Sequence, residues 1–441
     1  MSAAETTVAP SSAKPAPAKP RRRWYQFSLR SLTIVMVLCS VLLGALGWRL
    51  ERARRQAQTV VALRGLGCRV LYDYDYQRTM AGDYSWAPGG FNWPREPGSQ
   101  IPDIYIQWLG EDFFHDVFTV RASDVQPKSS QDVKQFWDLV ATLPGMHHFH
   151  LEGDWLEHDG FAALRGHNCL QQVTLRSKHV SDADLAVIGT MPKLRELHLT
   201  GRGMDITDDG IAALDELREL SGITLYDVAV SENAARHLAT HPKLRAIELV
   251  ESHLTDASTI WLAQLTELRR LSVSKSNVSD EGLRNLSVLT NLGSLNIGNT
   301  KTTDSGLIHL AKMKDLRFLN VENTKVHGPG LIHLHMHSKL ESVGCEGNPI
   351  TDDDLGYFTD LSSLHALAFG NSDVTDDGIR RLKVPPKVTR IDLRSTRITD
   401  QSLELLAGNS QLETLLVANT KVSAEGIARF NARLPTCRVV P

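Results

Sequence analysis

The sequence contains 17 histidines, and two groups of them have spacings that invite a metal-binding hypothesis. His147, His148 and His150 stand together, but no Cys or Asp completes a ligand set beside them. His333, His335 and His337 alternate along a segment that we expect to be helical, where residues two apart do not share a face. We therefore predict no metal site, and we expect the second group to be a solvated surface.

Motifs that carry catalysis or nucleotide binding are missing from the sequence. It holds no GxxxxGKS/T, no GxGxxG after a strand, no GxSxG and no HExxH. A Ser or Thr followed by Asp does recur, at Ser181, Thr207, Thr255, Ser279, Thr303, Thr351, Thr375 and Thr399. Such regular recurrence is typical of helix caps, in which the hydroxyl accepts a backbone N–H and the helix dipole favours the carboxylate. The sequence thus predicts neither an enzyme nor a cofactor.

The elements that would position these residues come from an internal repeat. The pattern L-x-x-L-x-L starts at Met146, Leu170, Leu194, Leu220, Leu244, Leu268, Leu292, Leu316, Leu340, Leu364, Val388 and Leu412. The step is 24 residues, except for 26 between Leu194 and Leu220, where Gly203 and Met204 are the insertion. Each unit predicts a short strand, a turn, a cap and a short helix, and none can bury its apolar face alone.

Stacked units of this kind predict an α/β solenoid. Strands about 4.8 Å apart form a concave parallel sheet, and bulkier helices outside force the stack to curve into a horseshoe. Cys345 should then point inward beside Val343. Hydroxyl residues follow most strands, and we expect them to satisfy loop backbone groups: Ser252, Ser276, Thr300, Thr324, Ser372, Thr396 and Thr420.

The repeats resemble those of bacterial membrane-anchored leucine-rich repeat proteins, whose unit reads LxxLxLxxTxVTDxGL. The segments LRFLNVENTKVHGPGL, from Leu316, and LETLLVANTKVSAEGI, from Leu412, nearly spell that unit. The chain is also similar to the cysteine-containing F-box type and, more distantly, to ribonuclease inhibitor. The resemblance covers about residues 146–441 and implies a leucine-rich repeat solenoid that binds partners on its concave face. An F-box adaptor is disfavoured, because no F-box-like helical domain precedes the repeats.

An apolar run near the N-terminus predicts one transmembrane helix. Leu32–Trp48 holds 17 residues without a charge, which is about 26 Å of helix, and Arg49 follows it. A cleaved signal peptide is the alternative, with Ala45-Leu46-Gly47 as a weak cleavage site. Basic residues on the two flanks nearly balance, so orientation stays open; a short tail and a large C-terminal part favour a bacterial inner-membrane protein with the repeats extracytoplasmic.

Five regions are predicted along the 441 residues. Residues 1–30 form a disordered, basic Ala/Pro-rich tail and 31–49 the transmembrane helix. Residues 50–76 form a juxtamembrane helix and strand, and 77–145 an aromatic-rich N-terminal cap. Residues 146–441 hold twelve repeats and a C-terminal cap strand.

Composition narrows the class of partner. The formal net charge of −3 gives no electrostatic argument for nucleic acid. The five cysteines show no CxxC pair, so they do not define a redox compartment. The expected partner is therefore a protein, whose identity the sequence does not reveal.

Side chains at the outward positions of the early strands are bulkier and more often charged than those of the middle strands, where Ser, Asn and Gly occupy these positions. This gradient predicts a contact patch in the N-terminal half of the array, made of His148, His150, Arg176, Glu196, His198, Tyr226 and Glu248. Two alternatives remain open at this point. The same residues fit an ordinary solvated surface, and the protein as a whole fits a cell-envelope spacer without a specific ligand.

Overall fold

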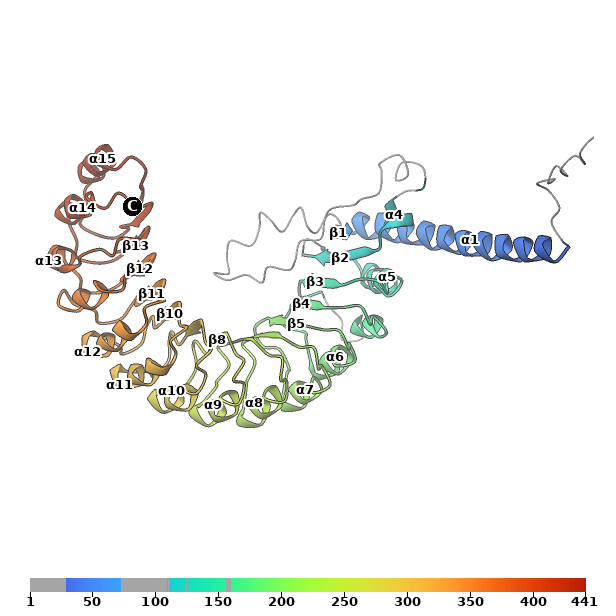
Figure 1. The fold of residues 1–441 in the computed structure, drawn as a ribbon, viewed down its shortest axis with the longest axis horizontal. Helices are drawn as coiled ribbons and strands as arrows, with labels where there is room; N and C mark the ends of the chain where they lie inside the picture. Colours follow the sequence, from blue (N-terminus) through green and yellow to red (C-terminus); the bar gives the residue numbers. More distant parts are fainter. Residues whose placement is uncertain (1–28, 73–108, 110, 124, 156–159) are drawn as a thin grey trace, which may run out of the picture. The chain divides into compact units, whose positions relative to one another are not determined.

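The structure is a computed structural model that describes residues 29–72, 109, 111–123, 125–155 and 160–441 (Figure 1). Most of the predicted tail, the end of the predicted juxtamembrane region from residue 73, and residues 77–108 of the predicted cap lie outside the described residues. The chain divides into two compact units, with the division between Ala53 and Arg54.

The first described element is a single long helix, α1 (Leu29–Gly65). Within the described residues it is the one helix long and apolar enough to cross a membrane. The apolar side chains of its first half are not part of a core, since Leu42 and Leu43 are each 68% exposed. The chain leaves the helix at Gly67, which has a positive φ of 95°, and the amide of Cys68 bonds back to the carbonyl of Leu63 at 3.0 Å.

The second unit begins with a cap that closes the N-terminal edge of the sheet. Strand β1 (Arg69–Tyr72) pairs with β2 (Val117–Ala122), beside the short helix α4 (Glu111–Phe114) and the longer α5 (Ser130–Ala141). The pairing of β1 with β2 is antiparallel, whereas the repeat strands form the parallel sheet that the sequence predicted. An antiparallel strand returns the chain at once without a crossover helix, which suits a terminus.

The cap packs through its own core. Val60 and Leu63, from the last turns of α1, are at most 2% exposed, and Thr59 shares a hydroxyl contact of 3.0 Å with Thr142. Trp137 of α5 packs between the rings of Phe149 and Phe161, with centroids 6.0 and 5.2 Å away. The aromatic residues thus cover the apolar end of the first repeat.

All remaining strands join parallel in chain order, from β3 to β15. Their bounds are β3 His148–Glu152, β4 Gln172–Arg176, β5 Glu196–Thr200, β6 Gly222–Tyr226, β7 Ala246–Val250, β8 Arg270–Ser272, β9 Ser294–Asn296, β10 Phe318–Asn320, β11 Ser342–Gly344, β12 Ala366–Ala368, β13 Arg390–Asp392, β14 Thr414–Leu416 and β15 Arg438–Val440. Within the second unit these strands line the inner side of a curved stack (Figure 1).

Short helices line the outer side of the same stack (Figure 1). The α-helices are α6 Asp182–Ile188, α7 Asp208–Ala212, α8 Glu232–Leu238, α9 Asp256–Leu262, α10 Asp280–Leu286, α11 Asp304–Leu307, α12 Gly328–Leu331, α13 Asp376–Arg381, α14 Asp400–Leu406 and α15 Ala424–Arg433. Tighter 3-10 turns replace or extend them at η1 Gly160–Leu164, η2 Ile308–Lys312, η3 Ile332–Met336 and η4 Asp354–Phe358.

The predicted register of the repeats is confirmed by burial. The first residue of every repeat, from Met146 to Leu412, is at most 1% exposed. Cys345 is fully buried, Val343 on the same strand is 1% exposed, and burial raises the pKa of the Cys345 thiol to about 12. The apolar core therefore runs without a break through the array.

The expected role of the hydroxyl residues is confirmed at six of the seven positions. Each of these six donates to the carbonyl three residues earlier, as Thr300 does to Ile297 at 2.7 Å and Thr396 to Leu393 at 2.7 Å. The prediction was wrong for Ser252, a buried hydroxyl without a partner among the described residues. The residue two places before it, Val250, still belongs to a full five-residue strand, whereas later strands end sooner.

The aspartates after the caps do more than the sequence indicated, because each binds the next repeat. Asp280 accepts the amide of Thr303 at 2.8 Å and its hydroxyl at 2.6 Å. The same pair of bonds joins Asp182 to Thr207, Asp256 to Ser279, Asp352 to Thr375, Asp376 to Thr399 and Asp400 to Ser423. We call this set the aspartate ladder. Bonds from Ser423 hold the pKa of Asp400 below its ordinary value.

The aspartate ladder explains the glycine of the TDxG motif. A Cβ at Gly306 would lie 2.4 Å from a carboxylate oxygen of Asp280, and one at Gly378 would lie 2.4 Å from Asp352. No real Cβ approaches an oxygen so closely, so only glycine leaves room for the carboxylate. The motif is therefore a contact between neighbouring repeats and not only a helix start.

We predict that Gly306→Ala lowers the free energy of unfolding by about 1–3 kcal/mol, because the carboxylate must leave two donors unpaired. Asp280→Ala should cost a similar amount, and the double variant should lose less than the sum, since the clash and the bonds involve the same carboxylate. Denaturant unfolding measures all three. Gly356→Ala, whose added Cβ would meet nothing within 4 Å, is the matched control. Fully additive losses would contradict the proposed contact.

Candidate functional site

The structure brings the predicted patch residues onto neighbouring strands. His150 on β3, His198 on β5 and Glu248 on β7 occupy one register position, with Thr174 and Thr224 between them. Arg176 and Tyr226 share the next outward position along the strands, and Glu196 and His148 the previous one. We call these seven predicted residues, together with Glu152 and Thr224, the N-terminal patch.

Polar contacts run across this patch from strand to strand. Glu152 lies 3.8 Å from His150 and 3.6 Å from Arg176. On the following strands, His198 lies 3.5 Å from Glu196 and its Nδ1 is 3.0 Å from the Thr224 hydroxyl, which donates to Glu248 at 3.5 Å. Because these side chains hold one another, the patch presents a fixed pattern of donors and acceptors.

Burial distinguishes the histidines of the patch. His148 is 9% exposed and packs against the ring of Phe118 at 4.8 Å. Desolvation, with a smaller contribution from His147, lowers its pKa from 6.5 to about 4. Burial also lowers the pKa of His150, whereas the hydrogen bond from His198 lowers that of Glu196. His148 is therefore largely covered, whereas His150 and His198 remain partly exposed.

The backbone beside Tyr226 adopts an unusual conformation. Asp227, Glu251 and Lys275 have φ values of 58°, 57° and 53°. The corresponding residues of later repeats are mostly Asn or Gly, such as Asn299 and Gly347, which tolerate this left-handed region better. Strain of this kind costs on the order of 1 kcal/mol and concentrates at functional sites.

Charged side chains at these left-handed positions lie close to Tyr226. The Lys275 ammonium lies 6.0 Å from the centre of the Tyr226 ring and 2.5 Å from the Glu251 carboxylate. That carboxylate raises the pKa of Lys275 above its ordinary value. The two-residue insertion also falls here, since the amide of Gly203 donates to Asp227 at 3.0 Å. The one departure from the 24-residue period thus borders the N-terminal patch.

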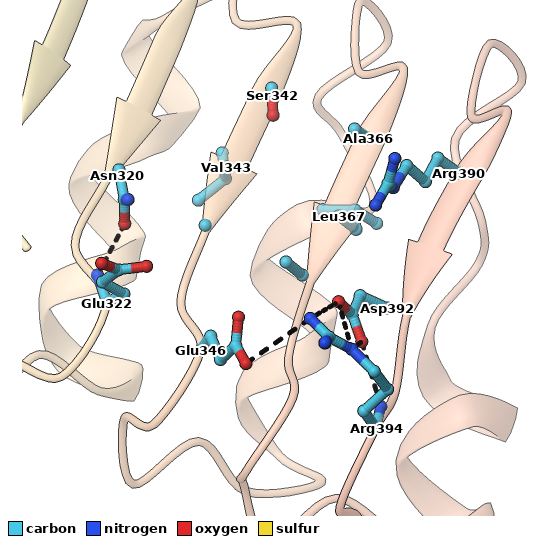
Figure 2. Close-up of a pocket in the computed structure, with 12 residues that line it drawn as sticks. Asn320, Glu322, Ser342, Val343, Glu346, Ala366, Leu367, Arg390, Asp392 and Arg394 are labelled. Carbon is cyan, nitrogen blue, oxygen red and sulfur yellow. Dashed lines mark hydrogen bonds and ion pairs between the residues drawn. The ribbon is translucent and has the colours of Figure 1, made fainter. Parts of the chain in front are cut away.

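A second feature, which the sequence analysis missed, is a hollow of about 270 Å³ on the same face, over β10 to β13 (Figure 2). Its floor is made of Gly344, Ala366 and Ala368, which carry almost no side chain. The sequence analysis interpreted the small outward side chains of these repeats only as a lack of contact residues. The charged outward residues that flank these small residues in the repeat alignment could have indicated the hollow.

The predicted solvent exposure of the histidines on the outer side of the stack was wrong for one of them. His337, which we expected to be solvated with His333 and His335, is fully buried, and its Nε2 lies 3.0 Å from the carbonyl of Leu310. Equivalent positions are apolar in most repeats, as at Leu289 and Leu361. An imidazole can occupy such a site because the carbonyl of the previous repeat satisfies one ring nitrogen. In the described part of the chain, no cluster of His, Cys, Asp or Glu has a metal-binding arrangement.

Parallel strands in a single register, short outer helices and inward leucines define a leucine-rich repeat solenoid. No protein-family model matches the sequence, and no curated protein matches it. Solved structures similar in fold include an internalin of Listeria monocytogenes, at 19% identity and a TM-score of 0.49, covering 69% of this chain and 88% of the internalin. At such identity the likeness concerns the fold alone.

Two further solved structures are similar in the same limited way. A leucine-rich repeat protein of Leptospira interrogans shares 15% identity with a TM-score of 0.36, over 68% of this chain and 91% of its own. Internalin C2 of Listeria monocytogenes shares 21% identity with a TM-score of 0.35, over 48% of this chain and 84% of its own.

We predict that stability falls as the pH drops from 6.5 towards 4, because His148 binds a proton more readily in the unfolded chain than in the folded one. The depressed pKa of about 4 contributes up to about 3 kcal/mol, present above pH 6.5 and lost as the pH approaches 4. The melting temperature of His148→Gln should depend less on pH over this range. His365→Gln, at an exposed histidine, is the control. Parallel curves for the wild type and His148→Gln would contradict the assignment.

Proposed function

We propose that this protein is a membrane-tethered scaffold that binds a protein partner through the concave face of its solenoid, and that it is not an enzyme. The observation that carries the proposal is the row of polar side chains at one register position of five neighbouring strands, from His150 to Glu248, in which His198 contacts Thr224 and Thr224 donates to Glu248. Strands about 4.8 Å apart make this row about 20 Å long, which fits a standard interface of about 800 Å² per partner.

The chemistry around Tyr226 supports recognition of a protein. Tyrosine and arginine are frequent hot-spot residues, and here Tyr226 and Arg176 occupy the same register position on strands β6 and β4. The left-handed backbone at Glu251 and Lys275 recurs in the turn of every later repeat, but here it carries long charged side chains where later repeats mostly have Asn or Gly. A binding role for these side chains would explain why the strain is retained.

The tether is supported by the exposure and the continuity of α1. The helix runs unbroken from Leu29 to Gly65, and its last turns are buried in the cap through Val60 and Leu63. Exposed leucines in its first half would be unfavourable in water, whereas a bilayer would cover them.

Removal of residues 1–53 should release the protein from membranes. The shortened chain, which begins at Arg54, keeps the buried turns of α1 and should appear in the soluble fraction after lysis, whereas the full chain stays in the carbonate-washed pellet. The intact mass of the mature protein should include the apolar segment. Retention of the shortened chain in the pellet would contradict the tether, and a mass that begins after Gly47 would show a cleaved signal peptide.

Partner binding should depend on Tyr226 and Arg176. A photo-crosslinking amino acid at Thr174 on β4, introduced into the full chain in native membranes, should capture one partner that the same amino acid at Tyr357 on η4 does not. Tyr226→Ala and Arg176→Ala should weaken binding of that partner at least about tenfold without changing the melting temperature. Tyr357→Ala and Arg397→Ala, at an exposed tyrosine and an exposed arginine elsewhere, are matched controls. No specific capture at Thr174 would favour a structural spacer.

A further inference from the structure

The hollow over β10 to β13 is shaped to admit another molecule. At the outward positions of β11 and β12, Gly344, Ala366 and Ala368 expose the sheet almost to its backbone. Larger residues stand on either side, with Asn320 and Glu322 at one wall and Arg390 at the other (Figure 2). Three strand spacings separate the walls, which is about 14 Å. That width is enough for one polypeptide segment.

The two glutamates of the hollow stand on adjacent strands, and of the two only Glu346 has an ion pair among the described residues, with Arg394. Backbone bonds from Val321 to Gly344 and from Asn323 to Glu346, each 2.8 Å, place Glu322 and Glu346 at one register position of adjacent strands. Their side chains turn in opposite directions, since Glu322 accepts the Asn299 amide and Glu346 the Asn371 amide, each at 3.2 Å. Like charges in this arrangement destabilise a sheet, and a cation between them would relieve that cost.

The arginines of the hollow are not equivalent. Arg394 is held by the buried carboxylate of Asp392, with Nη2 to Oδ2 at 2.6 Å, and reaches across the end of β12 to within 3.6 Å of Glu346 (Figure 2). Its charge is therefore already shared between two carboxylates. Arg390, in contrast, is exposed and forms no ion pair with any residue that the structure describes. One wall thus offers excess negative charge and the other an available guanidinium.

The size of the hollow favours a side chain over a metabolite. Small-molecule sites usually enclose about 300–1,000 Å³ and bury most of the ligand. A volume of about 270 Å³ on an open concave face instead suits one or two side chains of a larger partner.

We propose that this hollow is a second docking site, which binds a protein segment that places a basic side chain between Glu322 and Glu346 and an acidic side chain on Arg390. The site goes beyond the proposed function, because it shares no residue with the N-terminal patch. It also assigns a role to repeats in which the outward side chains are small. The open floor lets the backbone of the bound segment approach the sheet.

Peptide selection on the full chain tests the proposal. The protein in phosphatidylcholine nanodiscs is used to select binders from a displayed library of random 12-residue peptides, and the enriched peptides are synthesised for affinity measurement. The expected peptides contain both a basic and an acidic residue. Ala368→Tyr, which fills the floor, should weaken their binding at least tenfold. Ser294→Tyr, at an outward position of β9 outside the hollow, should leave it unchanged.

Charge reversal makes the test specific. Glu346→Lys should reduce binding at least tenfold, and a peptide whose basic residue is replaced by Glu should recover affinity for that variant. The proposal is overturned by an absence of enriched peptides, by peptides that lack one of the two charges, or by binding that Ala368→Tyr does not change. Peptides weakened by Tyr226→Ala but not by Ala368→Tyr would support the N-terminal patch and contradict the second site.

Discussion

In most repeats of this solenoid, the start of the helix is bonded to a carboxylate that belongs to the repeat before it. Asp280 accepts both the amide and the hydroxyl of Thr303, and Gly306 leaves the space that the carboxylate fills. The helices α6 to α14 could not be stable alone, because seven residues or fewer form too few internal bonds. The aspartate ladder therefore does two things at once: it completes the cap of each helix and joins that helix to its neighbour.

A fixed register has a direct consequence for the concave face. Residues 24 positions apart in the sequence become neighbours on adjacent strands, as His198 and Thr224 do despite the two-residue insertion between them. The insertion is accommodated outside the strands, so the row of outward side chains continues. The N-terminal patch and the hollow then differ in the side chains at equivalent outward positions, such as Glu248 in one and Gly344 in the other, and in the length of their strands.

The structural features that the sequence predicted correctly are those that depend on the period of the repeat. The inward leucines, the burial of Cys345 and most of the hydroxyl bonds follow from one repeated pattern, because a solenoid places equivalent residues in equivalent surroundings. Errors occurred where the surroundings change, as at Ser252, where a longer strand alters the loop, and at His337, which replaces an apolar residue. The hollow was missed because its shape comes from the absence of side chains at Gly344 and Ala368. The antiparallel pairing of the predicted juxtamembrane strand with β2 was not predicted, because that strand lies outside the repeat.

The direct measurement of the aspartate ladder is hydrogen exchange at the amides of the cap residues in the native protein. An amide at a helix cap normally has no intrahelical partner and exchanges readily. If the ladder holds the repeats together, the amides of Thr207, Ser279, Thr303, Thr375, Thr399 and Ser423 should be protected as strongly as strand amides. In Asp280→Asn, protection of Thr303 should fall most. Cap amides that exchange at the rate of exposed loops in the wild-type protein would contradict the account.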